Sequence, residues 1–88
     1  MLTLPETLTQ VHAQNCLAQL TDGLRVESEK VVVDATPLRS FDSAALAVLL
    51  ELRRECARLG KHFAVQGMPQ RLRELASLYG IEGLLPAA

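Results

Sequence analysis

The segment VVVDATPLRSFDSAALAVLL, residues 31–50, constrains the fold more than any other part of the chain. It begins with three valines, Val31–Val33, which are typical of a short strand buried on both faces of a parallel sheet. After a polar loop, Asp42 or Ser43 begins a helix that we expect to run to about Leu59. A buried strand, a loop and an amphipathic helix in this order indicate an α/β protein.

The predicted helix has a core stripe and an outward face of a different kind. Residues at helical spacing form the core stripe: Ala45, Val48, Leu49, Leu52, Cys56 and Leu59. A helical wheel places on the outward face Ser43, Ala47, Leu50 and Arg54. Because this outward strip is mostly small or apolar, it indicates a docking surface. The alternative is that Asp42 and Ser43 only cap the helix, and that the apolar residues are isolated on the surface.

Strand and helix patterns also alternate in the first half of the chain. One or two short strand pieces are predicted over residues 2–8. Helical spacing then predicts a helix over about residues 10–22, with Thr9 as its N-cap and Gly23 as its stop.

The last third of the chain continues this alternation. A strand is predicted over His62–Gln66, a helix over about residues 70–79 that ends at Gly80, and a last strand or extended tail over Ile81–Leu85. The whole order predicts an α/β domain with a small mixed or parallel four-stranded sheet and three crossover helices packed on it. At 88 residues the chain has room for one domain.

Composition and charge exclude several classes of function. The formal net charge is −1 and the aromatic residues are Phe41, Phe63 and Tyr79, so a nucleic-acid role has no support. The N-terminus lacks the features of a signal peptide, and no apolar run reaches the roughly 20 residues of a membrane span. We expect a cytoplasmic protein that does not insert into a membrane. Cys16 and Cys56 are predicted to be reduced core residues.

The sequence gives no positive sign of catalysis, of a metal site or of a cofactor. His12 and His62 have no identifiable nucleophile or zinc-like spacing. Asp34 and Asp42 could form a metal site or a phosphoryl acceptor, but a turn-forming role is the alternative for a strand-end aspartate. We therefore expect a protein that acts by binding another protein rather than as an enzyme.

The run DATPLRSFDSAALAVLLELRR resembles the central signature of STAS domains. This family includes anti-sigma-factor antagonists and the cytoplasmic ends of sulfate transporters. In the family a strand ends in Asp, as at Asp34, and an Asp-Ser or Asp-Thr pair, here Asp42 and Ser43, begins a helix rich in small residues. The resemblance covers residues 2–86 and implies a single STAS domain over residues 1–88.

The C-terminal run GMPQRLRELASLYGIEGLLP resembles the ending of the small STAS subunit of the Mla phospholipid-transport system. The matching positions are Leu75, Ala76, Leu78, Tyr79, Leu85 and Pro86. This resemblance implies a non-catalytic accessory subunit that binds the ATPase subunit of an inner-membrane ABC transporter. Such a subunit supports the maintenance of outer-membrane lipid asymmetry, and it would lie in the cytoplasm, held at the inner membrane by its partner.

The resemblance also implies which residues bind the partner. Ser43 matches the hydroxyl residue that phosphorylation-regulated members of the family use as a switch. In the Mla subunit, the residue at the matching position lies at the interface with the ATPase subunit. Ala44 and Ala45 are small residues where many relatives have Gly or Ser, so a partner can still approach closely. The expected partner-binding residues are Asp42, Ser43, Ala44, Ala47, Leu50 and Arg54.

Two further expectations follow from the family. The alternative function is an anti-sigma-factor antagonist, in which Ser43 is phosphorylated and the partner is an anti-sigma factor kinase. Many STAS domains also begin with an extra strand that this chain lacks. Its absence would expose a sheet edge through which copies of the chain could pair into a homo-oligomer.

Overall fold

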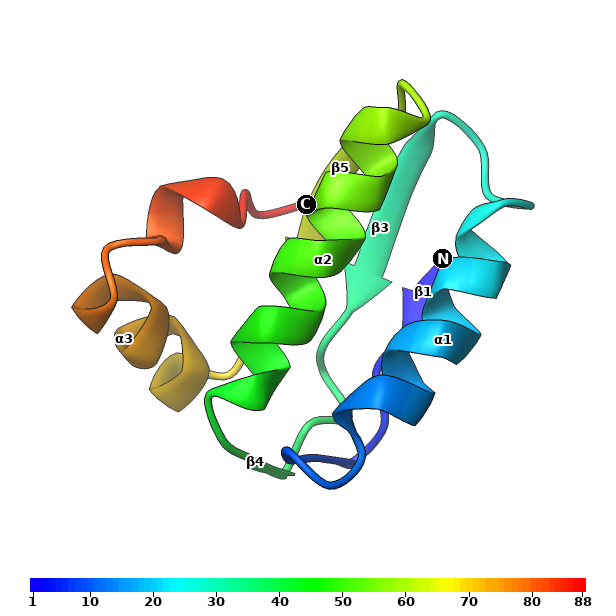
Figure 1. The fold of residues 1–88 in the computed structure, drawn as a ribbon. Coiled ribbons are helices and arrows are strands. Elements are labelled where there is room, and N and C mark those ends of the chain that lie inside the picture. Colours follow the sequence, from blue (N-terminus) through cyan, green and yellow to red (C-terminus); the bar gives the residue numbers. More distant parts are fainter.

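Three parallel strands form the central sheet of the protein, which a computed structural model describes over residues 1–88 (Figure 1). In spatial order they are β1 (Leu2–Thr3), β3 (Lys30–Asp34) and β5 (His62–Gln66). Val33, in the middle strand, pairs with Leu2 on one side and with Val65 on the other. The predicted strands in the middle of the chain are therefore confirmed.

The central sheet is buried on one face. Val31 and Val33 are buried, whereas Val32 between them is half-buried, because successive side chains of a strand point to opposite faces. Two helices, α1 (Ala13–Leu24) and α2 (Ala44–Arg58), lie side by side over the buried face (Figure 1). The expectation that this strand is buried on both faces is therefore wrong.

The boundaries of α1 differ from the predicted ones. A turn precedes the helix, in which the His12 N–H donates to the Thr9 carbonyl at 2.9 Å, so Thr9 is not the N-cap. The helix also runs through Gly23 instead of stopping there. Gly23 has a packing role, because a Cβ at this position would lie 3.0 Å from Cδ2 of Leu2.

Most of the predicted core stripe of α2 is confirmed. The buried members are Ala45, Val48, Leu49, Leu52 and Cys56. Leu59 is 39% exposed, because it lies beyond the last residue of the helix. Leu46 is buried although it lies outside the predicted stripe, and Leu50 is half-buried against the core. The buried sector of α2 is therefore wider than the stripe that the spacing predicts.

A second, smaller sheet lies at the N-terminal end of α2. It consists of β2 (Thr7–Leu8) and β4 (Ser40–Phe41), which pair in parallel. This pairing brings the N-terminal segment next to the loop that leads into α2.

The C-terminal part contains α3 (Gln70–Leu78) and the short 3-10 helix η1 (Glu82–Leu84), coloured orange and red in Figure 1. The predicted fourth strand is wrong, because residues 81–85 contain η1 and only Ala87 forms an isolated parallel bridge, with Val65. Pro86 has no N–H, which limits any longer ladder at this edge.

Both cysteines are free thiols, Cys56 buried and Cys16 half-buried. Burial raises the pKa of each thiol above its ordinary value of 9.0, and for Cys56 the charge of Lys61 opposes this effect. Both thiols are therefore protonated at neutral pH. None of the helices has the length and apolar character needed to cross a membrane.

Candidate protein-binding site

Asp42 fixes the start of α2 against the turn that precedes α1. Its Oδ1 accepts a hydrogen bond from the Ala44 N–H at 2.8 Å, and its Oδ2 accepts one from the Gln10 N–H at 3.1 Å. The first bond satisfies a free N–H at the start of the helix. The second joins segments 32 residues apart in the sequence. Asp42 thus holds the site in shape through both carboxylate oxygens.

Ser43 occupies the N-cap position of α2, yet its hydroxyl caps no backbone N–H. The side chain is exposed. Because Asp42 has taken over the capping, the Ser43 hydroxyl is available for a contact with a partner or for modification.

An open hollow of about 350 Å³ surrounds Ser43. Its lining consists of Gln10, Asp42, Ser43, Ala44 and Ala47. Ala47 is exposed and Ala44 is half-buried. Since both side chains end at Cβ, the surface of a partner can come close to the helix backbone here.

The structure divides the six predicted binding residues into two groups. Asp42, Ser43, Ala44 and Ala47 lie together around the hollow. Leu50 and Arg54 lie further along α2 and do not line it. Leu50 is half-buried against the core, and Arg54 is exposed, with its Nη1 3.7 Å from Oε1 of Glu51.

Reasoning from the sequence does not include Gln10 in the site. Gln10 lines the hollow, whereas the next residue, Val11, is exposed and does not line it. No pattern in the sequence marks Gln10, because its place at the hollow depends on its contact with Asp42.

Asp34, the last residue of β3, closes a turn with the residues that follow it. Its Oδ1 accepts hydrogen bonds from the Thr36 N–H at 3.0 Å and from the Thr36 hydroxyl at 2.7 Å. Asp34 thus binds the groups of its own turn, as the turn-forming alternative predicts. Asp42 instead caps α2 and binds the distant Gln10 N–H. No group of three or more His, Cys, Asp or Glu side chains is placed to hold a metal ion.

The protein is thus a small parallel α/β domain. Beside the hollow, at the start of its central helix, lies Ser43, whose side chain is exposed and makes no capping hydrogen bond. The sequence model of the family described as "Mlab, STAS domain" matches residues 1–86, and the chain belongs to this STAS family. The match includes both segments on which the resemblance depends. A comparison with curated proteins found no match.

Proposed function

We propose that the protein is a non-catalytic accessory subunit of an Mla-type phospholipid ABC transporter. It would bind the cytoplasmic ATPase subunit and so help to maintain outer-membrane lipid asymmetry. The family match supports this role, and the observation that carries it is the hollow of small residues around Ser43. In this proposal the protein is cytoplasmic, needs no cofactor and reaches the inner membrane only through its partner.

The site is suited to docking because its backbone is already fixed. Asp42 holds the start of α2 and the turn at Gln10 together, so little ordering is needed when a partner binds. Ala44 and Ala47 allow close approach, and the Ser43 hydroxyl can exchange a hydrogen bond with the partner. Leu50 and Arg54 would contact only the edge of the interface.

The test is the affinity of the purified protein for the purified ATPase subunit, with Ala47→Arg as the site variant. Because Ala47 is exposed, we expect the variant to fold normally and to bind at least about tenfold more weakly. Ala18→Arg places the same side chain at an exposed position of α1 and should bind like the wild type. Retained binding by Ala47→Arg, with thermal melting unchanged, would show that the docking face is elsewhere.

The second candidate function is an anti-sigma-factor antagonist controlled by phosphorylation of Ser43. The Ser43 hydroxyl is exposed and makes no capping hydrogen bond, which favours this function. A phosphate would add about −1.5 to −2 charges beside Asp42 and would weaken a close contact through repulsion and desolvation. Phosphoserine at position 43 in cells, with a kinase that binds Ser43→Ala but not Ser43→Asp, would replace the transporter role by this one.

A further inference from the structure

A second groove lies between β4 and α3. One of its lining residues is the neighbour in sequence of a residue that lines the hollow around Ser43. The groove has a volume of about 330 Å³. Its lining consists of Phe41, Arg71, Glu74, Leu75 and Leu78. Phe41 directly precedes Asp42, and Figure 1 shows α3 beside the N-terminal end of α2. We call this groove the α3 groove.

The last turn of α3 leaves apolar surface uncovered at this groove. Leu78 is 78% exposed, and Tyr79, the next residue, is 55% exposed. Leu75 and Phe41 are half-buried, so their side chains form an apolar floor that remains accessible. Exposed apolar residues that cluster in this way mark interaction sites more often than isolated ones do.

Arg71 adds a cationic group to this apolar surface. Its guanidinium carbon lies 5.5 Å from the centre of the Phe41 ring, as in a cation–π contact. Arg54 and Arg58 form ion pairs with glutamates of α2. Arg71 forms no ion pair, although Glu74 lines the same groove. A guanidinium over a ring can still donate hydrogen bonds, and a carboxylate is its best acceptor.

We propose that the α3 groove is a second contact for the same ATPase subunit and binds an amphipathic helix of that protein. The apolar side chains of the helix would pack on Phe41, Leu75 and Leu78, and an acidic side chain would pair with Arg71. A helix fits because the groove offers side chains rather than a free strand edge, so the occupant must satisfy its own backbone hydrogen bonds. This inference rests on the proposed function, because the groove adjoins the hollow through Phe41.

The first experiment measures the affinity of Leu78→Asp for the purified ATPase subunit. An aspartate on the apolar wall should weaken binding at least about tenfold, because a charged side chain would replace the apolar contact with the helix and would repel the acidic side chain that pairs with Arg71. Val26→Asp is the matched control, since Val26 is 85% exposed and lies in the turn after α1. This control should bind within about twofold of the wild type.

The second experiment tests the charge of the partner. Arg71→Glu should weaken binding about tenfold and reduce its dependence on salt concentration, because an attractive ion pair is lost. Arg73→Glu makes the same charge change on α3, but Arg73 does not line the groove, so its affinity should stay close to that of the wild type.

The set of variants separates the two proposals. If Ala47→Arg abolishes binding but Leu78→Asp and Arg71→Glu bind like the wild type, the α3 groove is not an interface and the proposed function stands. Equal losses in Arg71→Glu and Arg73→Glu would also overturn the inference, since they would indicate only a general charge effect. If the wild type does not bind the ATPase subunit, the proposed function fails and the inference fails with it.

Discussion

Among single residues, Gly67 has the least room for a side chain. Its φ is +67°, and a Cβ there would lie 2.0 Å from Cγ2 of Thr36. Thr36 is held in place, because its N–H and its hydroxyl both donate to the Asp34 carboxylate. Gly67 thus allows β5 to end against the loop that leads towards the binding site.

Gly67→Ala should therefore lower the free energy of unfolding by about 2–4 kcal/mol, from left-handed backbone strain together with the clash. Urea denaturation would measure the loss. Gly60→Ala is a matched control, because Gly60 has a φ of +71° but nothing within 4 Å of the added Cβ. That control should lose only about 1 kcal/mol. Similar losses in the two variants would mean that Thr36 moves aside.

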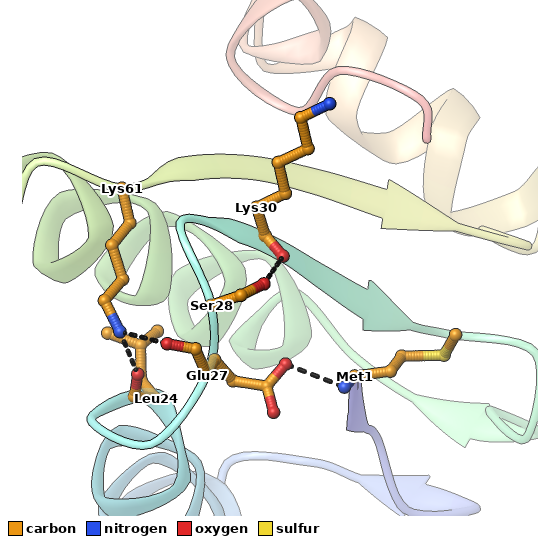
Figure 2. Close-up of polar contacts among 6 residues, drawn as sticks. All are labelled: Met1, Leu24, Glu27, Ser28, Lys30 and Lys61. Atoms are coloured by element: carbon orange, nitrogen blue, oxygen red, sulfur yellow. Dashed lines mark hydrogen bonds and ion pairs between the residues drawn. The ribbon is translucent and has the colours of Figure 1, made fainter.

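Between elements, Lys61 links the end of α1 to the start of β5 (Figure 2). Its Nζ donates to the carbonyls of Leu24 at 2.8 Å and of Glu27 at 2.6 Å. The Glu27 carboxylate in turn lies 2.7 Å from the amino group of Met1. A cation at the C-terminal end of a helix also interacts favourably with the helix dipole.

Lys61→Met should lower the free energy of unfolding by about 1.5–3 kcal/mol, because two carbonyls lose a charged donor. Faster hydrogen exchange in the last turn of α1 should accompany this loss. Lys30→Met is the control, since the Lys30 side chain points away from this cluster in Figure 2 and is exposed. It should change stability by no more than about 0.5 kcal/mol. A Lys61→Met variant as stable as Lys30→Met would show that water replaces the ammonium group.

Elements with strong local signals were predictable from the sequence, and elements set by packing were not. The strand of valines, the strand His62–Gln66 and the long helix α2 have the expected type and nearly the expected bounds. The predicted end of α1 at Gly23 was wrong, because the sequence does not distinguish a glycine that ends a helix from one that makes room for Leu2. The residues after Gly80 form a 3-10 turn, which has no apolar period of its own.

The candidate site divides in the same way. Asp42 and Ser43 could be found because a helix start is a local signal in the sequence. The place of Gln10 at the hollow and the α3 groove depend on contacts between distant segments, such as the bond from the Gln10 N–H to Asp42. A single sequence contains no pattern that reveals such contacts.

In the whole molecule, the two edges of the central sheet differ. Ala87 covers part of the outer edge of β5, where the Val65 N–H donates to the Pro86 carbonyl at 2.8 Å. The outer edge of β1 has no partner strand. Because the Leu4 N–H donates inward to the Asp34 carbonyl, the N–H and carbonyl of Thr3 point outward, as alternation along a parallel strand requires.

We predict that copies of the protein pair through this β1 edge, and only at high protein concentration, because two residues provide few hydrogen bonds. Light scattering after size-exclusion chromatography, over a range of concentrations, would detect the pairing. Thr3→Pro removes the outward N–H and should leave a monomer, whereas Thr3→Val keeps it and should still associate. A dimer that survives Thr3→Pro but is lost in Leu78→Asp would place the self-contact in the α3 groove, where it would compete with the ATPase subunit.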